Sequence, residues 1–83
     1  MNEILNRLSD WKSVIFLAQF YKEVIEVTDE DTKHLIWMCD QILSFDNFGK
    51  ANRWLGFIQG VLFARKIFTI DELRKHVKDA IDK

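Results

Sequence analysis

The chain contains no proline, and its apolar residues recur about every 3.6 positions along almost its whole length. Proline breaks helices and marks turns, so a chain without it is free to form long continuous helices. The Asn-Gly and Asp-Gly dipeptides that signal β-hairpins are absent as well. A length of 83 residues leaves room for a single domain. We predict an all-α domain over residues 1–83, folded as a small antiparallel four-helix bundle with three long helices and one short helix.

The first helical segment, from about residue 2 to residue 27, is apolar over a wide arc. It forms one helix, or two if Ser9 caps a second start. Over residues 11–27 the polar side chains span only about 100° of the helical wheel, which leaves more apolar surface than one bundle face buries. We therefore predict a homodimer with an interface made by Phe16, Phe20 and Val27. Alternatively, residues 1–8 fold back and cover this edge.

The second helix is predicted to begin after Thr28, a good N-cap residue that is followed by three acids. Trp37 falls in the middle of its polar face, and large aromatic residues in such positions are often interface anchors. The alternative is that a neighbouring segment covers the indole. Cys39 lies on the apolar face, where we expect an inert core thiol, and one cysteine allows no internal disulfide.

All three glycines of the chain lie in a third helix, predicted from about residue 48 to residue 66 and capped by Asp46 or Asn47. Gly56 and Gly60 each lower helix stability by about 0.8–1 kcal/mol relative to alanine, so a close neighbour should compensate for them. Either another helix of the chain packs against this glycine stripe, or the stripe lines a groove for a partner or a small anionic ligand. The polar residues beside the stripe, which would contact that partner or ligand, are Asn52, Arg53 and Gln59. Alternatively, these three side chains only solvate the edge of the helix.

The last helix has the clearest local signal. Thr69 and Glu72 have the spacing of a capping box, and Phe68 and Leu73 have that of a hydrophobic staple. Most acids and hydroxyls of the chain cluster at such helix starts, where capping accounts for them. The two histidines and the cysteine lack metal-binding spacing, and no nucleophile is paired with a base. We therefore predict no catalytic residue, no metal and no cofactor, and a protein that is not an enzyme.

The run NRWLGFIQGVLF, followed by FTIDELRKH, resembles a box near the C-terminus of short bacteriophage-encoded accessory proteins. The resemblance covers about residues 50–76. It implies a phage accessory protein acting in the host cytoplasm, and it brings no established activity from which a residue's role could be transferred. Such relatives often have a glycine-containing turn before the last helix, where this chain has Ala64 to Ile67. The residues that carry the resemblance are Asn52, Arg53, Trp54, Gly56, Phe57, Gln59, Gly60, Thr69, Asp71, Glu72 and Leu73.

These patterns favour a phage-type accessory protein that acts by stoichiometric binding to a host or phage protein. A module that binds a small anionic ligand or nucleotide on the glycine stripe is the second hypothesis. The third is a nucleic-acid-associated regulator, although a formal net charge of −1 argues against general phosphate-backbone binding. Its basic contacts would be Lys50, Arg53, Arg65 and Lys66. We expect a cytoplasmic protein without a signal peptide or membrane span, because the longest apolar run, Trp54–Ala64, is short and flanked by arginines.

Overall fold

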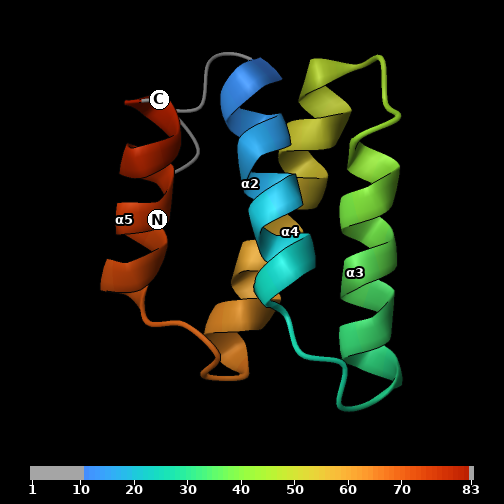
Figure 1. Ribbon diagram of the computed structural model, residues 1–83, viewed down its shortest axis with the longest axis vertical. Helices are drawn as coiled ribbons and strands as arrows, with labels where there is room; N and C mark the ends of the chain where they lie inside the picture. The colour runs from blue at the N-terminus through green and yellow to red at the C-terminus, as the bar shows by residue number, and fades with distance from the viewer. Residues whose placement is uncertain (1–10, 83) are drawn as a thin grey trace.

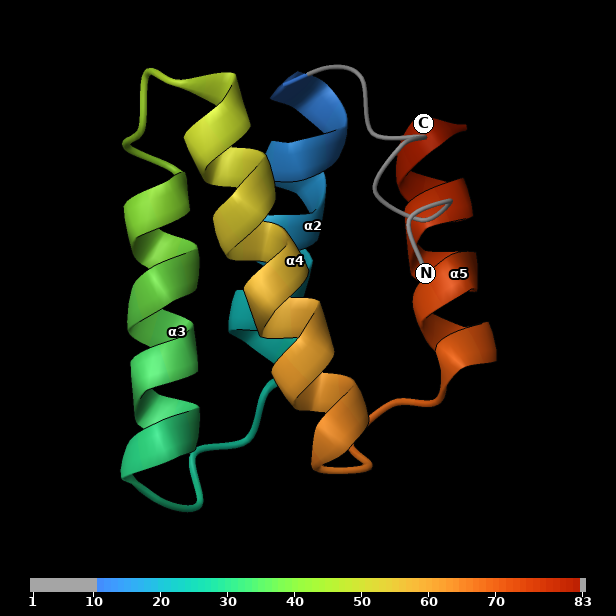
Figure 2. The same cartoon turned by 180° about the vertical axis from the view of Figure 1, so that it is seen from behind.

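The structure is a computed structural model and describes residues 11–82 of the chain. In this part of the chain all regular secondary structure is helical, so the all-α class is confirmed. Successive helices run in opposite directions, with α2 between α3 and α5 (Figure 1). From behind, α4 is the nearest helix and lies across α2 (Figure 2). The helices are α2 (Trp11–Val24), α3 (Glu30–Ile42), α4 (Phe48–Ala64) and α5 (Ile70–Ile81), with 14, 13, 17 and 12 residues.

The first helix ends at Val24, three residues before the predicted end at residue 27. The N–H of Ile25 still donates to the carbonyl of Tyr21, and the chain then runs without helix to Asp29. Val24, Ile25, Val27 and Thr28 are all β-branched, and such residues lose side-chain freedom in a helix. The predicted cap at Ser9 and the fold-back of residues 1–8 lie outside the described residues.

Asp29, rather than Thr28, caps α3. The carboxylate of Asp29 accepts from the N–H of Thr32 at 2.9 Å, and the Thr32 hydroxyl accepts from the N–H of Asp29 at 3.1 Å. The same carboxylate forms an ion pair with the guanidinium of Arg65, just after α4, with an N–O distance of 2.6 Å. The cap predicted at Thr28 is therefore wrong by one residue, because Asp29 is an equally good cap that also gains an ion pair.

The predicted caps of the last two helices are confirmed, and of the candidates Asp46 and Asn47 it is Asn47 that caps α4. The side-chain oxygen of Asn47 accepts from the N–H of Lys50 at 2.8 Å. The hydroxyl of Thr69 accepts from the N–H of Glu72 at 3.1 Å, and the Glu72 carboxylate accepts from the N–H of Thr69 at 2.8 Å. Both ends of this capping box are therefore formed, which fixes the start of α5.

The end of α4 is a left-handed turn. The helix stops at Ala64 rather than near residue 66, because Lys66 has a positive φ of 61°. The N–H of Lys66 donates to the carbonyl of Phe63 at 3.0 Å, and the N–H of Ile67 donates to that of Leu62 at 2.9 Å. This pair of bonds is the Schellman arrangement, in which the left-handed position is usually a glycine. The chain makes the turn with a lysine instead.

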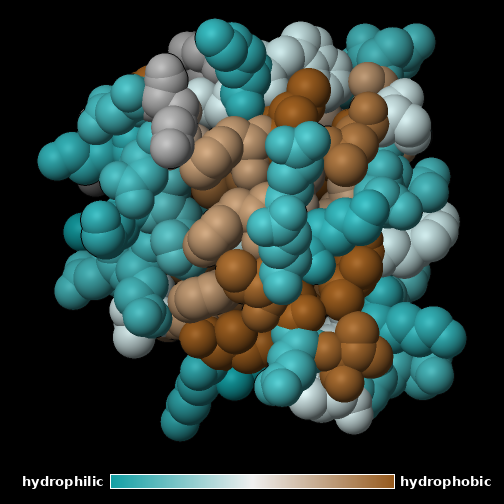
Figure 3. Space-filling view, viewed as in Figure 1, coloured by the Kyte–Doolittle hydropathy of each residue, from teal (hydrophilic) through white to brown (hydrophobic). Residues whose placement is uncertain are grey.

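The central position of α2 explains its wide apolar arc. This helix packs against each of α3, α4 and α5. Phe16 and Phe20 are partly buried against the core, so the exposed edge on which we based the dimer interface is not present at these two residues. Val27 does fit that expectation, with 58% of its surface exposed. Figure 3 shows apolar side chains along the middle of one face, beside the polar side chains that cover α5.

Candidate functional site: an aromatic groove between α3 and α4

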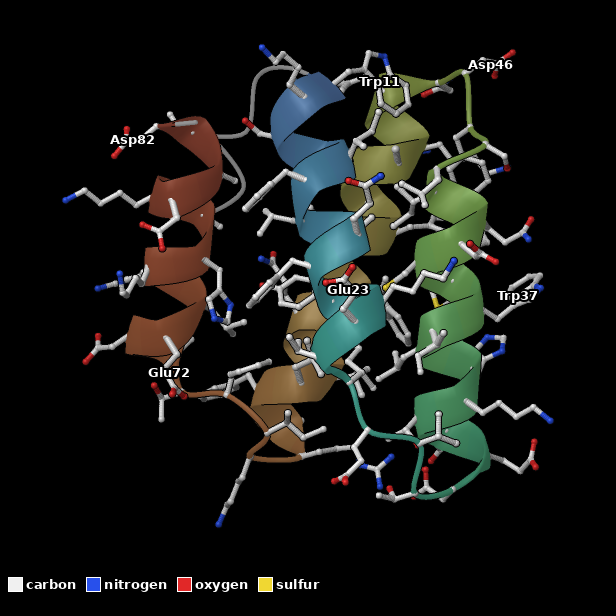
Figure 4. All side chains as sticks on the ribbon, viewed as in Figure 1. Trp11, Glu23, Trp37, Asp46, Glu72 and Asp82 are labelled. Carbon is white, nitrogen blue, oxygen red and sulfur yellow. The ribbon has the colours of Figure 1, made fainter. Side chains whose placement is uncertain are left out.

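Trp37 stands on the outer side of α3, where 49% of its surface is exposed. Figure 4 shows its side chain on the side of α3 that is turned away from α2 and α5. Its ring stacks on the ring of His34, with centroids 5.2 Å apart, and lies 6.1 Å from a ring of α4, that of Trp54. Its neighbours therefore hold the indole from one side and leave about half of it open to solvent.

A groove of about 420 Å³ lies between α3 and α4. We call it the α3–α4 groove, and the residues that line it are His34, Met38, Arg53, Trp54 and Phe57. A second hollow of about 320 Å³ adjoins it at His34 and is lined by Glu30, Lys33, His34 and Trp37. Volumes of this size are typical of sites that bury a ligand or a group of side chains.

The groove is apolar at its base and open at its rim. Met38 is buried, Trp54 is partly buried, and Phe57 at the rim is 58% exposed. The ring of Trp54 is supported by Phe45, which meets it edge-on with centroids 4.8 Å apart. Trp54 and the thioether of Met38 thus offer a contact surface that is held by packing within the chain, and the ring of Phe57 extends it into solvent.

Three cations surround this apolar surface. Arg53 lines the α3–α4 groove, Lys33 lines the adjoining hollow, and the Lys50 ammonium lies 4.6 Å from the centroid of the Phe45 ring. None of the three forms an ion pair with another residue between 11 and 82. Glu30 is the one acid among the residues that line the two hollows. The surface therefore has a local excess of positive charge on a chain whose net charge is −1.

The structure separates the polar residues that we predicted beside the glycine stripe. Arg53 lines the groove, but Gln59 is buried, and its amide nitrogen donates to the hydroxyl of Tyr21 at 3.2 Å. The side-chain oxygen of Asn52 is also buried and has no hydrogen-bond partner among the described residues. Gln59 therefore belongs to the core rather than to a surface that it would share with Arg53.

The glycine stripe itself is not packed against a helix at Gly60. This residue is exposed, and a Cβ added to it would meet no atom within 4 Å. The close approach by a neighbouring helix of the chain is therefore wrong at Gly60, whereas Gly56 is partly buried.

Sequence reasoning also missed the groove residues His34, Met38 and Phe57. Phe57 could have been found, since it lies outside the main apolar face of its helix.

A polar cluster inside the fold joins three helices. The Tyr21 hydroxyl on α2 lies 3.1 Å from Nδ1 of His76 on α5, and it also accepts from Gln59 of α4. Burial raises the pKa of Tyr21 to about 12 and lowers the pKa of His76. The phenol oxygen accepts from Gln59, and the imidazole tautomer sets whether Tyr21 or His76 donates in the bond that they share. This cluster has a structural role in the core.

The single cysteine is likewise a core group. Cys39 is fully buried, and desolvation raises the pKa of its thiol to about 11, so the reactive thiolate is scarce at neutral pH. Across residues 11–82 no cluster of three metal-binding side chains occurs. In the same part of the chain none of the helices has the length and apolar character needed to cross a membrane.

Comparison with known proteins gives no match: no protein-family model, no curated protein and no solved structure is significantly similar to this chain. The residues of the groove and of the hollow beside it are therefore the basis on which a function can be inferred.

Proposed function

We propose that this protein is a small phage-type accessory protein that acts by stoichiometric binding to another protein. Its helices, arranged as a small antiparallel bundle, would present the α3–α4 groove to that partner in the host cytoplasm, without catalysing a reaction. The observation that supports this most directly is the exposure of Trp37 and Phe57, 49% and 58%, beside two contiguous hollows. Large aromatic residues are enriched in binding hot spots, and Trp37 is in addition held in place by the rings of His34 and Trp54.

A site for a small anionic ligand on the glycine stripe is less well supported. That site needs Asn52, Arg53 and Gln59 on one surface, and Gln59 is buried against Tyr21. The nucleic-acid alternative loses a contact too, because Arg65 is engaged by Asp29 at 2.6 Å. The α3–α4 groove has an apolar base instead, which suits the side chains of a protein.

We also propose a homodimer. Fewer exposed residues support it than the wide apolar arc of α2 led us to expect from the sequence. Its support is the exposure of Val24 and Val27, 43% and 58%, at the end of that helix. Phe16 and Phe20 would contribute only through the atoms that packing leaves accessible.

The main proposal is tested by affinity capture from a bacterial lysate, with quantitative mass spectrometry and then reconstitution of the purified pair. Trp37→Ser should abolish capture of a protein that binds the wild type in a fixed ratio. Phe63→Ser is a matched control, since Phe63 has the same 49% exposure and does not line the groove. If no protein binds stoichiometrically, the proposal is wrong. If both variants capture the partner equally well, the surface formed by Trp37, the adjoining hollow and the groove is not the site.

A further inference from the structure

We propose that the partner of the α3–α4 groove is an acidic protein segment that inserts one large aliphatic or aromatic side chain between Trp54 and Phe57. This inference rests on the proposed function and names the chemistry of the partner. It combines two features of the same surface, an apolar base and a rim of cations that form no ion pair among the described residues.

The apolar base selects the inserted side chain. Met38 is 7% exposed at the bottom of the groove, and Trp54 and Phe57 lie along it on α4. A thioether adapts to side chains of different shape, while the aromatic rings hold their positions. Of this lining, Phe57 is the most exposed and would lose the most contact with water when an apolar group enters. An apolar anchor therefore gains more here than a polar one.

The cations select the residues that flank the anchor. Arg53 stands in the lining of the groove itself, and its planar guanidinium can bind a carboxylate through two parallel hydrogen bonds. Lys33 lies on α3, in the adjoining hollow that it lines together with His34 and Trp37. A segment that enters between them would place acidic residues against both. Complementary charges of this kind steer association and exclude basic partners.

The hollow shape favours a protein segment over single-stranded nucleic acid. Nucleic-acid platforms combine stacked aromatic rings with a basic groove that follows the phosphate backbone. Here Glu30 lies in the hollow together with Lys33, and the lining of the groove includes the buried thioether of Met38 beside the ring of Trp54. An apolar side chain fills such a base better than a stacked nucleobase does.

Selection from a displayed library of random 16-residue peptides tests this chemistry on the intact protein. Peptides enriched on the wild type should carry a net negative charge and one large apolar residue. A selected peptide should bind Arg53→Glu and Lys33→Glu at least about tenfold more weakly, and its affinity should fall with added salt. Arg74→Glu makes the same change in net charge at an exposed position on α5, and it should bind like the wild type.

The outcomes separate the inference from the proposed function. Enriched peptides that need Trp37 but have no acidic bias would overturn the inference and leave protein binding at the groove intact. No enrichment, or binding that is indifferent to Phe57→Ser in the lining of the groove, would overturn the inference, and capture from lysate would then decide the proposed function alone. Competition by a twelve-residue oligothymidylate with steep salt dependence would replace the protein segment with nucleic acid.

Discussion

The hydroxyl of Tyr21 and Nδ1 of His76 lie 3.1 Å apart, although 55 positions separate the two residues in the chain. This contact joins the central helix α2 to the last helix α5. The imidazole is also enclosed by aromatic rings, with the centroids of Phe20 and Phe68 at 4.9 Å and 4.7 Å. Burial disfavours the charged imidazole here and outweighs the carboxylates of Glu72 and Asp79, which favour it. Protonation of His76 therefore opposes the docking of α5 on α2.

Stability should fall as the pH drops below about 6.5, the ordinary histidine pKa. The pKa of His76 is lowered in the folded state, chiefly by desolvation, so the unfolded chain binds this proton first. The contribution of His76 is therefore complete above about pH 6.5 and is lost as the pH falls through its folded-state pKa. Denaturant midpoints between pH 7.5 and pH 5 measure this slope.

His76→Gln should flatten that pH dependence, because glutamine cannot take up the proton but its side-chain oxygen can still accept from Tyr21. The matched control is His34→Gln, which removes the other histidine of the chain from an exposed position. A slope that survives in His76→Gln would assign the acid sensitivity to another group.

Asp29, not Thr28, should be the residue on which the start of α3 depends. Thr69→Ala at the start of α5 provides a scale, since loss of an N-cap costs about 1 kcal/mol. Asp29→Ala should lower the unfolding midpoint further than Thr69→Ala, because it also removes the ion pair with Arg65. Thr28→Ala should change stability by less than about 0.5 kcal/mol. Equal losses at positions 28 and 29 would contradict the cap seen in the structure.

Lys66→Gly should stabilise the protein by up to about 1 kcal/mol, since glycine has no Cβ to resist the left-handed conformation. The measured quantity is the free energy of unfolding in denaturant. Lys66→Ala separates the backbone effect from loss of the charge, because alanine keeps the Cβ, and it should bring no gain. A stabilising alanine would mean that the lysine side chain, rather than the φ of 61°, is unfavourable.

Gly60→Ala should also be stabilising, by up to about 1 kcal/mol, which is the helix-propensity difference. A close helix contact would instead make Gly60→Ala destabilising. No such contact is present, because the added methyl would meet open space. Gly49→Ala is the internal comparison. Its Cβ would lie 3.3 Å from the capping oxygen of Asn47, so it should gain less than Gly60→Ala. A destabilised Gly60→Ala would imply that something covers this position in solution.

The features predictable from the sequence are those that depend on a few neighbouring residues. The capping box of Thr69 and Glu72 needs only their spacing, and the absence of proline already favoured helices. The roles of Gln59 and Phe20 could not be predicted, because they depend on which helix becomes central. Once α2 is surrounded by the other three helices, Phe20 packs on His76, and Gln59 turns inward to Tyr21.

The candidate site also contains one part that the sequence predicts and one part that it does not. Trp37 was identified because one aromatic residue on a polar face is visible on a helical wheel. The groove could not be identified in this way, because it combines side chains of two helices that are adjacent only after folding. Arg53 and Met38, for example, lie on α4 and α3 and line the groove together.

Self-association should be weak, and Val27 is the residue that tests it. Fully burying an apolar side chain contributes about 1.5–3 kcal/mol. Val24 and Val27 already have only about half of their surface to lose, 43% and 58% exposed. Two copies of this pair supply a few kcal/mol, which barely exceeds the lower estimates for the cost of association. The wild type should therefore sediment as a monomer at about 10 µM and dimerise only at millimolar concentrations and above, since a Kd of 1 mM already needs a net gain of about 4 kcal/mol.

Val27→Glu should keep the protein monomeric at every concentration without lowering its thermal midpoint, because the side chain is exposed. Phe20→Glu is unsuitable for this purpose, since a charge between Tyr21 and His76 should unfold the monomer itself. A wild type that remains monomeric near millimolar concentration would exclude the homodimer. A dimer that is tight at about 10 µM and survives Val27→Glu would place the interface elsewhere. The surface that carries the exposed rings of Trp37 and Phe57 would then be the next to test, because these rings offer more apolar area than two valines.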